Sequence, residues 1–191
     1  MTPSKILRLT AWTFPVVLVC GGAPRERGIL ANTLFNITEL PVPTPSATPT
    51  GITSAADGSV WLTETTANKV TQMTTTGVFT EHAIPTAASA PQWITTSPDG
   101  FVWFTERYGR KIGRISETGG AIAEFAVPGT GAYPTAIATD AAGRIWFASE
   151  DSAATARIGW ISPAGVITEL ATGATRTAIT GIAAGPTEIS G

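Results

Sequence analysis

Residues 99–116 have the sequence DGFVWFTERYGRKIGRIS, in which two short hydrophobic runs are separated by a polar turn. Runs of four to eight residues bounded by glycine-containing turns are typical of antiparallel strands joined by hairpins. The first run recurs as DGSVWLTE at residues 57–64 and as AGRIWFASE at residues 142–150. The tryptophans of the three copies lie 42 and 43 residues apart, at Trp61, Trp103 and Trp146. The chain therefore contains an internal repeat.

Two further sets of residues follow the same period. They are the glutamates Glu39, Glu81, Glu124 and Glu169 and the isoleucines Ile52, Ile94, Ile137 and Ile182. Four-stranded units of about 40–45 residues are typical of β-propeller blades, because one such sheet cannot bury both of its faces alone. The predicted fold is therefore all-β, a β-propeller of four-stranded antiparallel blades that is incomplete, with about three and a half blades.

The predicted domain organisation is an N-terminal segment at 1–36 followed by a partial propeller at 37–191. Its blades are expected at about 51–84, 93–127 and 136–171, with orphan strands at 37–41 and 179–185. The tryptophans are expected to pack between neighbouring blades rather than to bind a ligand. About three and a half blades leave two open edges, so a homodimer through these edges is geometrically conceivable.

The composition excludes several classes of function. The 191 residues include 12 Lys and Arg against 14 Asp and Glu, so the net charge of −2 provides no basic surface for nucleic acid. One cysteine, Cys20, rules out an internal disulfide and any zinc site built on several cysteines. One histidine, His82, must serve any His-dependent catalytic group. It follows Glu81 in a predicted outermost strand, where we expect an ordinary surface residue.

The N-terminal segment has the order of a secretory signal. Lys5 and Arg8 precede an apolar stretch at residues 9–19, and small residues follow at 21–23. The apolar stretch is too short to span a bilayer, which needs about 20 residues, so no integral membrane span is expected. If the segment is a signal peptide, the protein is secreted or periplasmic; otherwise it is cytoplasmic. Pro15 inside the stretch also fits a disordered or wrongly assigned N-terminus.

The unit from Pro91 to Pro128 resembles the streptogramin lyase family, also called the virginiamycin B lyase family. The resemblance extends over about residues 37–186 and implies a propeller of seven blades. It also implies a carbon–oxygen lyase that opens the ester linkage of a cyclic depsipeptide antibiotic by a magnesium-assisted elimination. In this family the base is a histidine directly after the proline that opens the innermost strand, with metal-binding carboxylates near it and at the end of the second strand.

The chain departs from that pattern at the base. The corresponding positions are Thr50, Gln92, Thr135 and, in the last copy, Thr180, and none of them is histidine. The carboxylates match better, because Glu64, Glu106 and Glu150 close their second strands. These three are candidate ligands for Mg²⁺ on one face of the propeller. The alternative is that they are solvated residues that hydrogen-bond to the backbone of adjacent hairpins.

A candidate ligand-binding set lies on the same face. Arg107, Tyr108 and Arg110 follow Glu106 into one loop, and Gln92, Trp93 and Tyr133 approach from the loops before the innermost strands. We predict that Gln92, Trp93, Arg107 and Tyr133 contact a small-molecule or peptide ligand, unless they are ordinary exposed residues. Because the family histidine is missing, the isolated chain is expected to be inactive or a fragment of a lyase. The alternative function is a non-catalytic binding or interaction scaffold.

Overall fold

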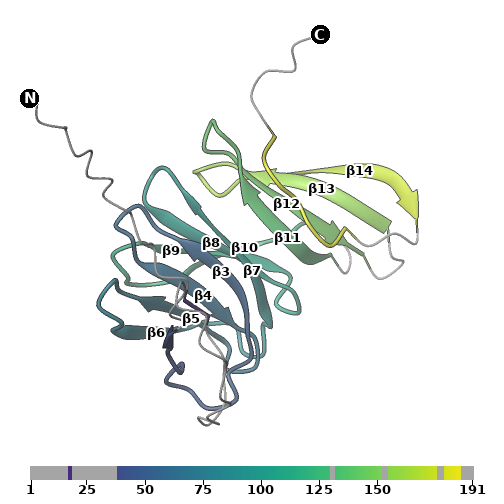
Figure 1. Ribbon diagram of the computed structural model, residues 1–191. Helices are drawn as coiled ribbons and strands as arrows, with labels where there is room; N and C mark the ends of the chain where they lie inside the picture. Colours follow the sequence, from purple (N-terminus) through teal and green to yellow (C-terminus); the bar gives the residue numbers. More distant parts are fainter. Residues whose placement is uncertain (1–16, 19–37, 130–131, 152–154, 176–178, 186–191) are drawn as a thin grey trace, which may run out of the picture.

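The computed structural model describes residues 17–18, 38–129, 132–151, 155–175 and 179–185, and every regular element in these ranges is a strand (Figure 1). A short parallel pair joins β1 (Val17–Leu18) to β2 (Thr38–Glu39). Apart from Val17 and Leu18, the predicted signal segment lies outside the described residues. Within the described ranges, no helix is both long and apolar enough to cross a membrane.

The other twelve strands form three antiparallel sheets of four strands each. In all three sheets, consecutive strands along the chain are neighbours. The first sheet contains β3 (Pro49–Ser54), β4 (Val60–Glu64), β5 (Lys69–Met73) and β6 (Phe79–Ala83). The second contains β7 (Pro91–Ser97), β8 (Phe101–Glu106), β9 (Lys111–Ser116) and β10 (Ala123–Ala126). The third contains β11 (Tyr133–Thr139), β12 (Ile145–Glu150), β13 (Thr155–Ile161) and β14 (Ile167–Thr175). The prediction of a partial propeller built from four-stranded blades is confirmed.

The two predicted orphan strands are shorter or less regular than expected. Of residues 37–41, only Thr38 and Glu39 are in a strand. Residues 179–185 are described but form no strand, although the Thr135 hydroxyl donates a hydrogen bond of 2.8 Å to the Ile179 carbonyl. An innermost strand is held by a ladder to the second strand of its own sheet. No such partner is paired with residues 179–185 in the described chain, so this segment has no strand ladder.

The blades are held together by tryptophan. Trp61 on β4 has no exposed surface and packs in one cluster with Ile94 and Phe104 of the second sheet. Trp103 on β8 packs in the same way with Ile137 and Phe147 of the third sheet. The prediction that these tryptophans pack between blades is confirmed for both. The row of sheets is continuous because the innermost strands β3 and β7, and β7 and β11, also contact each other.

The glycine in the KIGRI sequence is explained by the same packing. Gly113 on β9 pairs with Phe104 on β8, and the phenyl ring lies across the glycine. A Cβ atom on Gly113 would come within 2.2 Å of the ring carbon Cζ of Phe104. The third sheet repeats this arrangement with Gly159 and Phe147. The absence of a side chain at these positions is therefore what lets each phenylalanine lie flat on its own sheet.

We predict that Gly113→Ala lowers the free energy of unfolding by about 1–3 kcal/mol, the usual cost of forcing an extra methyl group into a packed core. The double variant Gly113→Ala/Phe104→Leu should lose less than the sum of the two single variants, because the smaller leucine makes room for the methyl group. Urea denaturation of the four proteins measures this coupling. Additive losses would contradict the proposed contact.

Candidate functional site

The candidate site lies at one end of the sheets, called here the rim, where the innermost strands begin and the second strands end. The strand register defines it, because Pro49 pairs with Glu64, Pro91 with Glu106 and Tyr133 with Glu150. Neighbouring blades are linked at this end. The Thr63 hydroxyl donates to the carbonyl oxygen of Gln92 at 2.6 Å. The first and second blades are therefore joined at the rim.

A loop at residues 107–110 carries three of the polar and aromatic side chains at the rim, Arg107, Tyr108 and Arg110. Two backbone hydrogen bonds hold this loop to the segment before β7. The Tyr108 amide donates to the Ser89 carbonyl at 2.9 Å, and the Arg107 amide donates to the Ala90 carbonyl at 3.2 Å. Ser89 itself is fully buried, and both its amide and its hydroxyl donate to Asn68 Oδ1 at 2.8 Å. The linker between the first two blades thus sets the position of the loop.

The side chains from this loop meet residues of the third blade. Arg107 Nη2 forms an ion pair of 2.8 Å with Glu150 Oε1, and the Tyr108 ring lies edge-on to Tyr133 with centroids 6.4 Å apart. The Arg110 guanidinium lies 5.2 Å from the centre of the Tyr133 ring. These contacts join the second and third blades across the rim.

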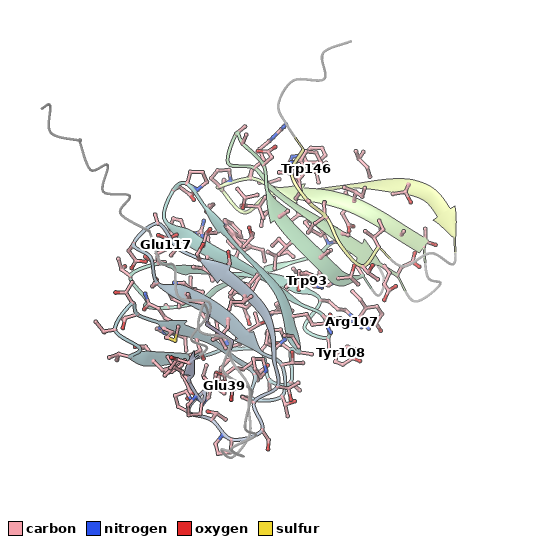
Figure 2. The ribbon with its side chains drawn as sticks, in the orientation of Figure 1. Glu39, Trp93, Arg107, Tyr108, Glu117 and Trp146 are labelled. Atoms are coloured by element: carbon pink, nitrogen blue, oxygen red, sulfur yellow. The ribbon has the colours of Figure 1, made fainter. Side chains whose placement is uncertain are left out.

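Trp93 lies at the start of β7, at the same end of the sheets, and its amide donates to the Thr105 hydroxyl at 3.0 Å. In the view of Figure 2, the labels of Trp93, Arg107 and Tyr108 fall on the side of the second sheet toward the third. Trp93 is 46% exposed and Tyr108 is 65% exposed, although both are large and apolar over most of their surface. We call Trp93, Arg107, Tyr108, Arg110 and Tyr133 the rim cluster. Of the four predicted ligand-contacting residues, the structure places Trp93, Arg107 and Tyr133 in this cluster, whereas half-buried Gln92 contributes its backbone carbonyl to the contact between blades.

The positions that correspond to the family base serve a structural purpose in this chain. The Thr50 hydroxyl lies 2.8 Å from the Thr65 hydroxyl and 3.3 Å from the Gln92 carbonyl oxygen. Thr135 makes the equivalent contact with the Ile179 carbonyl. The Thr50 hydroxyl thus links β3 to β7, the Thr135 hydroxyl links β11 to the segment 179–185, and neither has a tendency to accept a proton near neutral pH.

Two of the three candidate metal ligands are buried inside their blades. Glu64 and Glu106 have no exposed surface. Glu64 Oε1 accepts a hydrogen bond of 2.8 Å from the Thr71 hydroxyl, while neither carboxylate oxygen of Glu106 has a hydrogen-bond partner in the described chain. Burial, together with the negative charge of Glu124, raises the pKa of Glu106 to about 8. Glu106 is therefore mainly protonated at neutral pH.

Glu150 occupies a different structural position from Glu64 and Glu106. In the third blade Pro134 pairs with Ser149, as Pro49 pairs with Glu64 and Pro91 with Glu106. Ser149 thus takes the buried position, and its hydroxyl donates to Glu169 Oε1 at 2.8 Å. Glu150 comes one residue later and binds Arg107 on the rim instead.

This arrangement does not fit a shared magnesium ion. Mg²⁺ prefers an octahedral set of oxygen ligands. Across the described ranges, no group of three or more His, Cys, Asp or Glu side chains is placed to hold a metal ion. Two of the candidate carboxylates are buried in separate blades, and the third is neutralised by a guanidinium. Glu64, Glu106 and Glu150 are therefore not placed to bind one magnesium ion together. Whether the protein binds magnesium elsewhere stays a prediction.

His82 makes its ring contact with Trp61 of the first blade and not with a residue of the rim. It lies in the outermost strand β6, as predicted, but it is half-buried rather than a freely exposed surface residue. Its ring stacks on Trp61 with centroids 5.7 Å apart, and its buried Nε2 atom has no hydrogen-bond partner in the described residues. Burial lowers its pKa, so the neutral imidazole acts as part of the packing between blades.

Comparison with known proteins is consistent with this architecture. The model of the virginiamycin B lyase family matches residues 30–189. The chain belongs to the virginiamycin B lyase family. It is 32% identical to a streptogramin B lyase of known structure, with a TM-score of 0.65, over 71% of this chain and 44% of that protein. It is 30% identical to the virginiamycin B lyase of Staphylococcus aureus, with a TM-score of 0.60, over 81% of this chain and 66% of that enzyme.

A catalytically inactive variant of the S. aureus virginiamycin B lyase, solved with quinupristin, is 29% identical, with a TM-score of 0.59 and the same coverage. The chain thus spans between 44% and 66% of the length of these three proteins. No curated protein matches the chain.

The buried carboxyl group of Glu106 makes a prediction about pH. Its folded pKa of about 8 lies above the ordinary value of 4.5, so the folded protein binds more protons than the unfolded chain between these two values. Its contribution to stability is complete below pH 4.5 and is lost as the pH rises through 8. Glu106→Gln should raise the melting temperature at pH 8 and flatten its fall between pH 6 and 8.

Differential scanning calorimetry across this pH range provides the measurement. Glu39→Gln serves as the control, because Glu39 is exposed and lies in the two-residue strand β2. An identical pH dependence in the wild-type protein and Glu106→Gln would show that Glu106 is not protonated in the folded state.

Proposed function

We propose that the rim cluster binds a cyclic depsipeptide of the streptogramin B type, and that these 191 residues do not open its ring by themselves. The observation that carries the proposal is the exposed group of aromatic and guanidinium side chains that joins two blades at the rim. Membership of the virginiamycin B lyase family supports the choice of ligand, as does the quinupristin bound to the inactive S. aureus variant.

The chemistry of the rim cluster suits such a ligand. A cyclic depsipeptide presents amide and ester carbonyl groups together with apolar side chains. The exposed faces of Trp93 and Tyr108 can pack against apolar groups, and the guanidinium groups can donate hydrogen bonds to carbonyl oxygens. Glu150 pairs with Arg107, so that guanidinium is already largely neutralised. A ligand without a large net charge therefore fits better than a polyanion.

Among the described residues, no imidazole belongs to the rim cluster, and its one carboxylate partner, Glu150, is paired with Arg107. The reaction of the family needs a group that removes a proton next to a carbonyl, while a bound magnesium ion would stabilise the negative charge that develops. The chain has one imidazole, and it is stacked on Trp61 in the outermost strand of the first blade. Glu106 has a pKa suited to proton transfer but no exposed surface. Neither group can reach a ligand that lies on the rim cluster.

We therefore propose that an active lyase takes its base from outside these 191 residues. We expect no ring opening when the purified chain is incubated with quinupristin, with or without Mg²⁺. Hydrolytic or eliminative opening is measured by mass spectrometry and fragmentation of the product, with the S. aureus virginiamycin B lyase as the positive control. Formation of a linear product by the purified chain would overturn the non-catalytic part of the proposal.

Binding is tested separately by isothermal titration calorimetry with quinupristin. We expect saturable binding that Tyr108→Ala weakens about tenfold, because the variant removes an exposed aromatic face worth roughly 1–1.5 kcal/mol. Val166→Ala is the matched control. Val166 is similarly exposed, at 63%, but lies in the β13–β14 turn at the opposite end of the third sheet.

If the wild-type chain and both variants bound quinupristin with equal affinity, the binding site would not include Tyr108, and the proposed location of the ligand at the rim cluster would be wrong. If the wild-type chain gave no heat in the titration and no chemical-shift changes in NMR spectra recorded with quinupristin, the proposal that it binds this ligand would be refuted. Circular dichroism of each variant confirms that it is folded.

A further inference from the structure

The turns that join the second and third strands of the first two blades have the same backbone. Residues 65–68 and 107–110 each follow the buried glutamate that ends the second strand and precede the lysine that begins the third. In both turns the first two amides donate to carbonyl groups of the linker before the innermost strand, at 2.9–3.2 Å. Both turns end in the left-handed region, with φ of 57° at Asn68 and 56° at Arg110. The two turns can therefore be compared side chain by side chain.

In the first blade, the side chain at the end of the turn serves the fold. Asn68 Nδ2 donates to the Ile84 and Thr86 carbonyls at 3.3 and 2.9 Å. Its Oδ1 atom accepts from the amide and the hydroxyl of Ser89, both at 2.8 Å. Asparagine is also one of the few residues with a side chain that adopt the left-handed conformation readily. Asn68 thus holds the linker between the first two blades and suits its own backbone.

Arg110 has the same position in the second blade but serves neither purpose. Its guanidinium lies 5.2 Å from the centre of the Tyr133 ring, and its Nη2 atom donates to the Tyr133 hydroxyl at 3.4 Å. Within the described ranges, its side chain has no ion pair and no hydrogen bond to the linker that follows β10. Arginine carries a steric cost in the left-handed conformation, and residues held in this way are concentrated at ligand sites.

Three departures from the repeat meet at this point. They are Arg110 in place of Asn68, Tyr108 in place of Thr66, and Tyr133, which precedes the proline of its innermost strand, in place of Ala90. The new side chains contact each other, since the Tyr108 and Tyr133 rings lie edge-on with centroids 6.4 Å apart and Arg110 lies over Tyr133. Side chains that depart from a repeat together and meet in one place indicate a built site.

Arg107 differs from its counterpart in the first blade but keeps its purpose. The Thr65 hydroxyl donates to the Pro91 carbonyl at 2.6 Å, and Arg107 pairs with Glu150 at 2.8 Å. Both side chains link their own blade to the next one. Arg107 is therefore explained by the fold, whereas Arg110 is not.

We propose that Arg110, Tyr108 and Tyr133 form one subsite, in which Arg110 is the specificity-determining residue and donates hydrogen bonds to a carbonyl oxygen of the bound depsipeptide. A guanidinium has five N–H donors in one plane. In the described part of the chain, one of them is used, in the long hydrogen bond to Tyr133. The contact with the Tyr133 ring orients that plane, so the other donors can meet an oxygen acceptor. This inference rests on the proposed function, because it names the residue of the rim that selects the ligand.

Arg110→Asn restores the residue of the first blade and separates fold from binding. We expect the melting temperature to rise by about 2–4 °C, because asparagine suits the backbone and can donate to the linker as Asn68 does. The same variant should bind quinupristin about tenfold more weakly, since it removes hydrogen bonds from a charged donor. Differential scanning calorimetry and isothermal titration calorimetry measure the two effects. A lower melting temperature would show that Arg110 serves the fold and would overturn the proposal.

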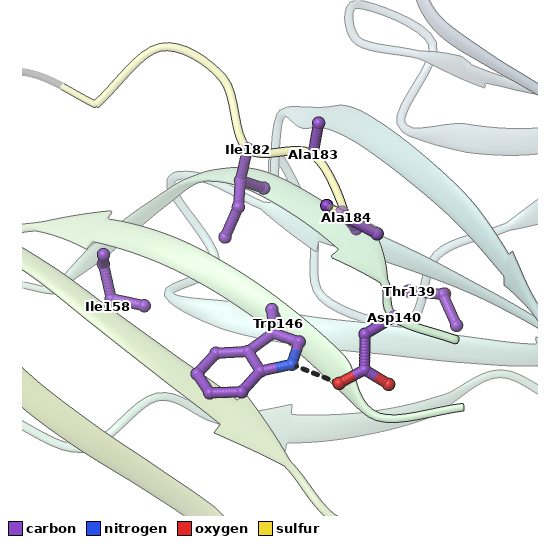
Figure 3. Close-up of a pocket in the computed structure, with 9 residues that line it drawn as sticks. Thr139, Asp140, Trp146, Ile158, Ile182, Ala183 and Ala184 are labelled. Carbon is purple, nitrogen blue, oxygen red and sulfur yellow. Dashed lines mark hydrogen bonds between the residues drawn. The ribbon is translucent and has the colours of Figure 1, made fainter. Parts of the chain in front are cut away.

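Arg144→Asn is the matched control for the loss of a positive charge. The Arg144 side chain is 61% exposed, and its Nε atom pairs with Asp140 Oδ2 at 2.7 Å. Figure 3 shows the same carboxylate accepting a hydrogen bond from the Trp146 indole. Asp140 follows β11 at the end of the third sheet away from the rim, so this variant should bind quinupristin with unchanged affinity.

Arg110→Lys keeps the charge but not the planar set of donors, and it should recover only a small part of the lost affinity. Full affinity of this variant would overturn the assignment of a hydrogen-bonded carbonyl oxygen. Binding that Tyr108→Ala weakens but Arg110→Asn leaves unchanged would overturn this inference alone. If the wild-type chain did not bind quinupristin, both this inference and the proposed function would be wrong.

Discussion

No blade of this protein can bury both faces of its own sheet, and the tryptophan contact between blades is the interaction that resolves this. Each four-stranded sheet is thin, so its apolar residues are removed from water only when the next sheet covers them. Trp61 and Trp103 supply the largest side chains of these contacts. The phenylalanine opposite each tryptophan can approach closely because a glycine lies beneath it, as Gly113 lies beneath Phe104. The position of each later blade follows from this packing.

The rim depends on the same contacts. A ligand-binding surface that crosses from one blade to the next is useful only if the blades are fixed relative to each other. The buried hydroxyl of Ser89 and the amide oxygen of Asn68 hold the linker between the first two blades, and the linker in turn holds the loop at residues 107–110. The ion pair between Arg107 and Glu150 then joins this loop to the third blade. The loop that carries Arg107, Tyr108 and Arg110 is therefore positioned by backbone and buried groups.

The sequence predicted the fold well because a repeat reports the same information several times. The tryptophan spacing located the second strand of every blade, and the glycine turns separated the strands. It predicted the carboxylates less well. In a strand, Glu106 shares a face with Phe104, which lies two residues earlier and is fully buried. This alternation was the signal that Glu106 is buried as well. The position of Glu150 depends on a one-residue difference in strand register, and the irregularity of residues 179–185 depends on which strands are neighbours. Neither is visible in residue spacing.

The proposed function separates binding from chemistry within one fold. The rim cluster is built from side chains of loops and strand ends, which the packing of the blades tolerates in many forms. The base position of the family lies inside an innermost strand, where a side chain can also serve the contact between blades. Here the Thr50 hydroxyl contacts the Gln92 carbonyl of the next innermost strand, and the Thr135 hydroxyl contacts the Ile179 carbonyl of the segment 179–185. A histidine at either position would have to give up that hydrogen bond or make it with a ring nitrogen. The contacts between blades and the chemistry of the site thus compete for the same positions, and in this chain Thr50 and Thr135 make structural contacts there.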